Sequence, residues 1–213
     1  MRSEKRERRA SDILDAAAEV FAEKGFEESH IGIIAARADV VIGTVYNYFE
    51  SKDGLILALT ARYARETVRL REELVADPPH DPLVALDAYN AIAFDNSLCH
   101  LSKPLWRRVL QAGMASGENL STMMPMIDEL LLGQVTRMLQ TLQRRGRLRD
   151  GVNVRDLAAI ALAIQTIHWQ RFVASDAIPL AQVKRVVSRQ TRLALNGFVT
   201  PKQCGGSEKG RQR

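Results

Sequence analysis

Apolar residues recur at helical spacing along almost the whole of this 213-residue chain, and no stretch alternates apolar and polar residues for long. The segment from Glu4 to Lys24 is the clearest example, with a single apolar stripe that is followed by Gly25. No Asn-Gly or Asp-Gly pair joins two strand-like runs, as a hairpin would require. The sequence therefore predicts an all-α protein of about nine helices.

Prolines, glycines and capping residues divide the chain into segments. The clearest break is at 77–82, where three prolines within five positions cannot continue a helix. Asn153 and Asp156 resemble a capping box that opens a later helix. We expect helices at about 4–24, 31–38, 42–49, 51 to beyond 74, 83–100, 104–115, 118–145, 153–174 and 179–196, then a disordered tail over 200–213.

Composition excludes several classes of protein. Hydrophobic residues make up 46% of the chain and charged residues 26%, which is enough apolar content for a core. The two cysteines, Cys99 and Cys204, supply neither a disulfide scaffold nor a Cys-x-x-Cys zinc site, and the four histidines lack metal-ligand spacing. The longest apolar run, 157–164, is far shorter than the roughly 20 residues of a membrane span. We expect a cytoplasmic protein with no metal or cofactor and no membrane contact, in which Cys99 is buried.

The net charge of +5 does not by itself indicate a nucleic-acid partner, because the positive excess lies late in the chain. Residues 137–213 hold 15 Lys and Arg against 4 Asp and Glu, whereas residues 1–136 are net negative. Residues 1–9 are an exception, with five cations against two glutamates. An argument for DNA binding therefore has to rest on local pattern.

That pattern is found in the first three expected helices, which form a helix-turn-helix unit with its motif at about 30–49. The second helix of the motif carries Tyr46, Asn47 and Tyr48 in succession, and these span about 200° of helix surface, so some must face outward. Asn can read a base edge, and Tyr and Thr hydroxyls commonly bond phosphate. Gly43 allows close approach of the backbone, and Lys52 is placed to reach a phosphate.

Residues 11–59 resemble the DNA-binding domain of the TetR (tetracycline-repressor) family. The resemblance rests on four stretches, of which the last is the family's most specific signature: Ile13-Leu-Asp-Ala-Ala-Ala18, Phe21-Ala-Glu-Lys-Gly-Phe26, Ile34-Ala-Ala-Arg-Ala38 and Gly43-Thr-Val-Tyr-Asn-Tyr-Phe-Glu-Ser-Lys-Asp53. The resemblance implies a homodimer that binds a palindromic operator on double-stranded DNA, usually as a repressor. It also implies a C-terminal pocket for a small-molecule effector.

Three features of the motif depart from the family pattern. His30 and Ile33 stand where a capping box is usual, so we expect Ser29 to cap the second helix instead. Asp39 replaces the usual turn glycine, and Asp tolerates left-handed geometry at a modest cost. Val41-Ile42 replaces Ser-Lys, which leaves apolar contact, for example with a thymine methyl group. The basic arm at 1–9 would then supply the missing charge.

The predicted DNA contacts come from the arm, the motif and the start of the next helix. Phe49 and Val45 are interpreted as core, Tyr48 and Asn47 as DNA contacts, and Tyr46 remains open between the two. The full predicted set is Arg6, Arg9, His30, Ile42, Gly43, Thr44, Tyr46, Asn47, Tyr48 and Lys52.

Large apolar side chains gather in the second half of the chain. They fit either an effector pocket or an ordinary helical core, and the family resemblance favours a pocket for an uncharged or weakly polar hydrophobic compound. Asn90, Gln111, Gln165 and His168 are the polar residues expected to orient a ligand there. The predicted pocket set is Phe94, Trp106, Leu110, Met114, Met123, Gln165, His168 and Trp169.

The last two expected helices are apolar over wide arcs, and two such helices from each of two chains would form a four-helix interface. The predicted interface residues are Leu157, Ala161, Ile164, Val183, Val187, Gln190 and Ala194. The expected organisation is a DNA-binding domain at 1–52, a ligand-binding and dimerisation domain at 53–199, and the tail.

The sequence thus predicts a TetR-like regulator, most simply a repressor that a small hydrophobic effector releases from DNA. One alternative is a ligand-independent DNA-binding protein of the same fold. The other is an all-α enzyme, which we set aside because no nucleophile elbow, carboxylate-metal motif or phosphate loop is present.

Overall fold

The structure is a computed structural model that describes residues 2–115 and 118–200 and, among these, the side chains of all but residues 2 and 112–125. This part of the chain forms ten α-helices and one short 3-10 helix and contains no β-strand, which confirms the all-α prediction. None of its helices is both long and apolar enough to cross a membrane. The helices are α1 (Arg2–Lys24), α2 (Ile31–Arg37), α3 (Ile42–Phe49), α4 (Lys52–Leu70), α5 (Glu72–Ala76), α6 (Pro82–His100), α7 (Lys103–Ala115), α8 (Glu118–Arg144), α9 (Val154–Ala174) and α10 (Leu180–Leu195), followed by η1 (Asn196–Phe198).

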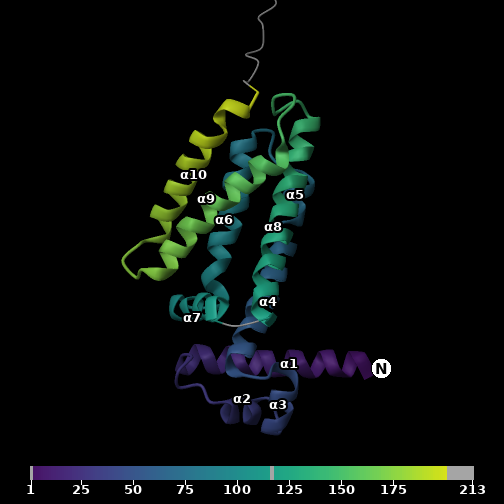
Figure 1. Cartoon of the computed structure of the whole chain (residues 1–213), viewed down its shortest axis with the longest axis vertical. Coiled ribbons are helices and arrows are strands. Elements are labelled where there is room, and N and C mark those ends of the chain that lie inside the picture. Colours follow the sequence, from purple (N-terminus) through teal and green to yellow (C-terminus); the bar gives the residue numbers. More distant parts are fainter. Residues whose placement is uncertain (1, 116–117, 201–213) are drawn as a thin grey trace, which may run out of the picture.

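The molecule has two parts that α4 joins (Figure 1). At one end α1 lies across α2 and α3, and α4 rises from this unit into a larger helical body. In the body α6, α8, α9 and α10 run along the long axis, while α7 lies across the base, next to the three-helix unit. Apart from Thr200, the predicted tail lies outside the described residues.

The hydrophobic core of the three-helix unit extends into the body. It contains fully buried residues of α1, α2 and α3, such as Phe21, Ile34 and Val45, together with Leu55 and Leu59 of α4. Leu101, Leu105 and Val109, on and just before α7, belong to the same cluster. The core therefore continues past residue 52. Because the core is close-packed, α7 and the first half of α4 cannot move relative to the three-helix unit without disturbing this packing.

Two further clusters hold the body together. One surrounds the fully buried Tyr89 and joins α5, α6, α8 and α9, and the other contains Phe94 of α6 and Phe172 of α9 together with Val183 and Val187 of α10. Each large side chain buried in this way contributes roughly 1.5–3 kcal/mol relative to exposure. These two clusters thus fix the helices of the body relative to one another.

Helix ends lie close to where the capping residues place them. Ser51 accepts a hydrogen bond from the Gly54 N–H and begins α4, and Asn153 accepts from the N–H groups of Arg155 and Asp156 to begin α9. The difference from the prediction is a break at Arg71, which separates α4 from the short α5. The Arg71 N–H donates to the carbonyl of Val68, three residues earlier, where α4 ends. The Arg71 side chain is buried in the body.

Candidate DNA-binding surface and effector body

The turn between α2 and α3 depends on Asp39. Its φ is +51°, so it adopts the left-handed geometry that the sequence predicted for this residue. The Val40 N–H then donates to the Ala35 carbonyl, which closes the turn against the end of α2. Because Ile34, Ala35 and Val45 are buried, α2 and α3 are held at a fixed angle and the opposite side of α3 faces solvent.

The outward side of α3 is apolar and amide-bearing. Val41 is 74% exposed, Ile42 50% and Tyr46 48%, and Asn47 is also exposed. Val45 is buried, as predicted, and Phe49 packs against the core of the unit. Tyr48 is only half-buried and packs against the same core, so part of its ring serves packing as well as the surface. Neighbouring large apolar residues that are exposed are typical of an interaction surface.

The basic residues at 2–9 belong to a helix. They form the first two turns of α1, which extends without interruption to Lys24, so the expected arm is rigid. The guanidinium of Arg6 lies 5.8 Å from the centre of the Tyr48 ring, so the start of α1 is beside α3. Arg9 is half-buried, whereas Arg6 is exposed.

Lys52 is at the start of α4, as expected, and its side chain makes contacts within the protein. Its ammonium donates to the carbonyl oxygens of Phe26 (2.7 Å) and Glu27 (3.2 Å), and it lies over the Phe26 ring. These contacts tie the start of α4 to the loop after α1. A phosphate contact by Lys52 would have to compete with them.

The cap of α2 also differs from the prediction. Ser29 is fully buried, but its hydroxyl donates to the carbonyls of Val20 and Gly25 and so completes the end of α1. The prediction that Ser29 caps α2 is therefore wrong. His30 is the N-cap residue of α2; its side chain makes no capping hydrogen bond and is exposed.

A charged pair connects the body to the three-helix unit. Arg108 of α7 donates two hydrogen bonds to the Asp53 carboxylate at the start of α4, at 2.9 and 2.8 Å. The same guanidinium lies 4.9 Å from the centre of the Phe26 ring. Because a bidentate pair fixes orientation as well as distance, movement of α7 is passed to α4 and to the loop after α1.

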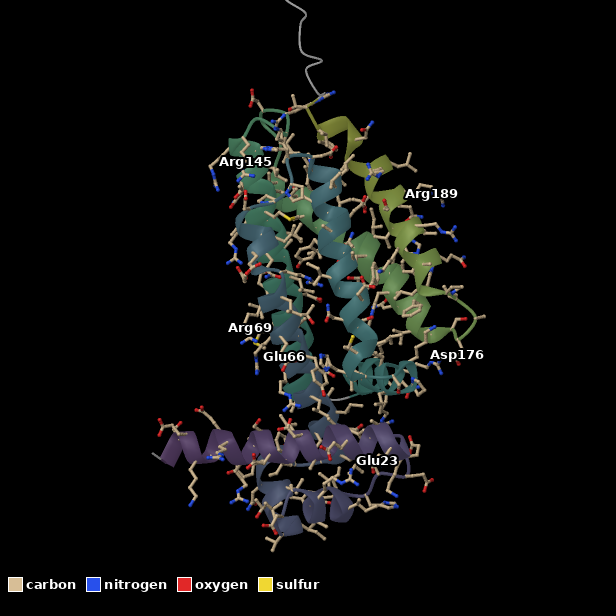
Figure 2. All side chains as sticks on the ribbon, turned by 180° about the vertical axis from the view of Figure 1, so that it is seen from behind. Glu23, Glu66, Arg69, Arg145, Asp176 and Arg189 are labelled. Carbon is tan, nitrogen blue, oxygen red and sulfur yellow. The ribbon has the colours of Figure 1, made fainter. Side chains whose placement is uncertain are left out.

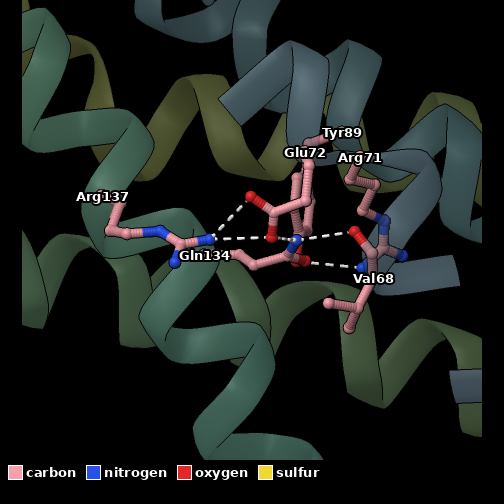
Figure 3. A network of polar contacts seen from close by, with 6 residues as sticks. All are labelled: Val68, Arg71, Glu72, Tyr89, Gln134 and Arg137. Atoms are coloured by element: carbon pink, nitrogen blue, oxygen red, sulfur yellow. Dashed lines mark hydrogen bonds and ion pairs between the residues drawn. The ribbon is translucent and has the colours of Figure 1, made fainter. Parts of the chain in front are cut away.

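A polar network fixes the other end of α4 inside the body (Figure 3). Arg71 is 2% exposed and donates to the Tyr89 hydroxyl, which in turn donates to Gln134 of α8. Gln134 donates to the Val68 carbonyl and to Glu72, and Arg137 completes the chain at Glu72. Burial lowers the pKa of Arg71 and raises the pKa of Tyr89. No carboxylate bonds Arg71 directly among the described residues, and its Nε has no partner there.

The predicted pocket residues are partly brought together, but mainly as packing. Phe94 is fully buried, and Trp106, Leu110 and Trp169 pack around its cluster, with the two indoles edge to face at 4.8 Å. Gln165 is buried with an unpartnered Oε1, and His168 bonds Gln190 of α10 at 2.8 Å. Met114 and Met123 lie outside the described side chains. Cys99 is exposed, which corrects the expectation that it is buried.

An open groove of about 800 Å³ lies between α6 and α10. Phe94 is the one predicted pocket residue on its wall, and Asn90, expected to orient a ligand, is also there. The rest of the lining was missed, because local sequence does not show that α6 and α10 pack side by side. The excess of cations in residues 184–192 was the available signal.

The predicted dimer face needs correction. Leu157, Ala161, Val183 and Val187 are almost fully buried inside the monomer, so they cannot contact a second chain. The wide apolar arcs of α9 and α10 mainly serve packing within the body. On α9 the exposed stripe is one position away, with Ile160 44% and Ile167 46% exposed and Ala163 between them. Ile164 and Gln190 are half-buried and Ala194 is exposed, so these three stay predictions.

Residues 13–59 match the family model described as bacterial regulatory proteins of the tetR family. The chain therefore carries the DNA-binding domain of tetR-family bacterial regulatory proteins. The matched segment covers the end of α1, the exposed helix-turn-helix and the first turns of α4.

Three comparisons extend the likeness into the helical body. The fatty acid metabolism regulator protein of Bacillus subtilis is 26% identical over 147 residues, which is 67% of this chain and 72% of the relative. The structure of Thermus thermophilus FadR, a TetR-family repressor in complex with lauroyl-CoA, has a TM-score of 0.69 at 18% identity and covers 93% of this chain and 99% of its own. The structure of Bacillus subtilis FadR with stearoyl-CoA has a TM-score of 0.65 at 22% identity and covers 85% and 96%. At these identities the two structures show a shared fold.

Proposed function

We propose that this regulator is a cytoplasmic homodimeric repressor without catalytic activity, and that it binds a palindromic operator until a long-chain acyl thioester of coenzyme A releases it. The observation that carries the DNA-binding part is the outward side of α3. Exposed Ile42, Tyr46 and Asn47 lie on a helix whose buried side is fixed by the turn at Asp39. Such a helix fits the major groove, where Asn reads adenine and an apolar side chain meets a thymine methyl group.

A two-fold dimer would present two such helices to two half-sites about one helical turn apart. The exposed stripe Ile160, Ala163 and Ile167 of α9, with half-buried Val186 of α10, supports this part of the proposal. A stripe at spacings of three and four is the pattern of helices that pack against a partner.

The effector class comes from the relatives. The sequence relative with the long match is named as a fatty acid metabolism regulator, and the two related structures are complexes with lauroyl-CoA and stearoyl-CoA. The Arg108–Asp53 pair supports a route from the body to the DNA-binding unit, because it couples α7 to the first turn of α4. An effector shifts the operator affinity only by as much as it prefers one arrangement of these parts.

The test is selection of bound fragments from the source genome with the purified full-length chain, followed by footprinting. We expect a palindromic site protected on two half-sites. Lauroyl-CoA added to the complex should then lower operator affinity, by the five- to 150-fold that is typical of coupled sites.

Failure to enrich any fragment at moderate salt, before and after refolding, would reject DNA binding by this chain. A palindrome that lauroyl-CoA leaves occupied would instead reject the effector class and favour the ligand-independent alternative. A sedimentation measurement that finds only monomers would reject the two-fold dimer.

A further inference from the structure

The groove between α6 and α10 has an apolar wall and a cationic rim. Exposed Leu193 of α10 and half-buried Ala91 of α6 form the accessible apolar part, and the nearly fully buried Leu83, Phe94 and Val187 lie behind it. Lys184, Arg185, Arg189 and Arg192, all on α10, supply the cations. A volume of about 800 Å³ falls within the range of small-molecule sites, roughly 300–1,000 Å³.

The four cations divide into two kinds. Lys184 pairs with Asp95 and Arg192 with Asp87, both carboxylates being on α6, so these pairs join the two helices. Arg185 and Arg189 are exposed and have no ion-pair or hydrogen-bond partner among the described residues. They lie one helical turn apart, where like charges repel. Arg189 is at the outer edge of α10 (Figure 2).

A second observation in the groove indicates a missing partner. Asn90 is only 6% exposed and lines the groove, yet its buried Nδ2 has no hydrogen-bond partner in the described part of the chain. Buried polar groups are nearly always hydrogen-bonded. The groove thus combines apolar residues, an unpartnered amide and two unpaired guanidiniums. This combination fits a ligand that has both a hydrocarbon chain and oxygen atoms that accept hydrogen bonds.

We propose that this groove holds the acyl-coenzyme A effector, with the acyl chain along the apolar wall and the phosphates of coenzyme A on Arg185 and Arg189. This assignment rests on the proposed function for the identity of the ligand. Arg pairs with phosphate through two parallel hydrogen bonds, and two guanidiniums one turn apart match a diphosphate. Asn90, whose Nδ2 lacks a partner in the described part of the chain, is the amide in this groove that could donate to a ligand oxygen.

The groove and the proposed dimer stripe of α9 lie on different sides of α10. Lys184 and Arg192 contact α6, which places the groove on the α6 side of α10. Gln190 bonds His168 of α9, so α9 and its exposed stripe lie on another side of α10. A ligand in the groove therefore touches α10 beside the dimer face, where it can bias the spacing of the two DNA-binding units.

The experiment is calorimetric titration of the full-length protein with lauroyl-CoA, with free laurate and with coenzyme A. We expect the double variant Arg185→Ala/Arg189→Ala to weaken lauroyl-CoA by about tenfold or more and to leave laurate unchanged, because only the phosphates are lost as partners. Ser188→Trp, which fills the groove from α10 and keeps both charges, should weaken lauroyl-CoA and laurate alike.

Arg65→Ala/Arg69→Ala is the matched control. These two arginines are also exposed and one turn apart, but they lie on α4, and Figure 2 shows Arg69 and Arg189 on opposite sides of the body. The control removes the same charge and should leave lauroyl-CoA binding within about twofold. Unchanged operator affinity in every variant shows that the fold is intact.

Two outcomes overturn the assignment in different ways. In the first outcome, the wild type binds lauroyl-CoA tightly, and neither Arg185→Ala/Arg189→Ala nor Ser188→Trp weakens this binding. The effector site is then elsewhere, and the proposed function is not affected. No binding of lauroyl-CoA by the wild type rejects both the groove assignment and the effector class, while operator selection still tests DNA binding on its own.

Discussion

The helix that should read DNA and the helix with the largest net positive charge lie in different parts of the molecule. From Ile42 to Phe49, α3 has no charged residue, whereas α10 has four cations over a similar length. Positive charge attracts any polyanion, and a basic chain is easily interpreted as a DNA-binding one. In this molecule the exposed side of α3, which we propose reads DNA, is apolar and amide-bearing, and the cations of α10 line a groove in the body. The net positive charge and the proposed DNA-reading surface are therefore in different places.

Asn47→Ala tests the uncharged side of this comparison and should have the largest effect. Asn47 is the exposed amide of α3, and the loss of a bidentate base contact costs about 1–3 kcal/mol, roughly a five- to 150-fold rise in operator Kd. Fluorescence anisotropy with the selected operator measures it. Asn196→Ala, an exposed amide at the far end of α10, is the control and should bind as the wild type does. Equal Kd values for the two variants would show that α3 does not read bases through this residue.

Arg108→Met tests whether the two regions communicate. The change removes the bidentate pair to Asp53, so operator affinity should persist while the effect of lauroyl-CoA on it falls by about fivefold or more. The neighbouring Arg107→Met is the control, since Arg107 bonds Val173 and Asp176 inside the body and does not reach α4. If release by lauroyl-CoA is as strong in Arg108→Met as in the wild type, coupling passes through the shared core instead.

The sequence predicted the parts of this structure that local chemistry determines. Helix ends at Ser51 and Asn153 follow from capping, and left-handed Asp39 follows from the short side chain at a turn. The orientation of Leu157 and Val187 could not be predicted, because α9 and α10 are apolar on more than one side and packing decides which side is buried. The groove was missed for the same reason, since it exists only where α6 meets α10.

Ile42→Lys puts a cation back on the recognition helix and sharpens the comparison. One added phosphate contact should steepen the dependence of log K on log salt by about 0.9 and tighten binding at low salt. Operator titrations at several salt concentrations give the slope. The variant Arg185→Ala/Arg189→Ala should leave the slope unchanged, because the proposed partner of those arginines is not DNA. A shallower slope in that variant would mean that α10 takes part in DNA binding.

Glu23→Gln should have the smallest effect, and it concerns the packing of α1 on α2. Arg37 donates to both Glu23 oxygens, at 2.5 and 2.8 Å, and this hydrogen bonding lowers the pKa of Glu23 below its ordinary 4.5. Because the folded chain keeps Glu23 charged where the unfolded chain takes up a proton, the pair contributes its full stability above pH 4.5. That contribution is lost as the pH falls below 4.5 and through the lower folded pKa.

Both groups of this pair are exposed, so the contribution is small. Urea unfolding of the wild type and of Glu23→Gln should give midpoints that differ slightly at pH 7 and converge as the pH falls through the lowered folded pKa of Glu23. Glu28→Gln is the control, since Glu28 is exposed and Arg37 bonds Glu23 and Glu19 instead of it in the described part of the chain. Midpoints of Glu23→Gln and Glu28→Gln that follow the same course with pH would show that the Arg37 contact adds nothing to the unit that positions α3.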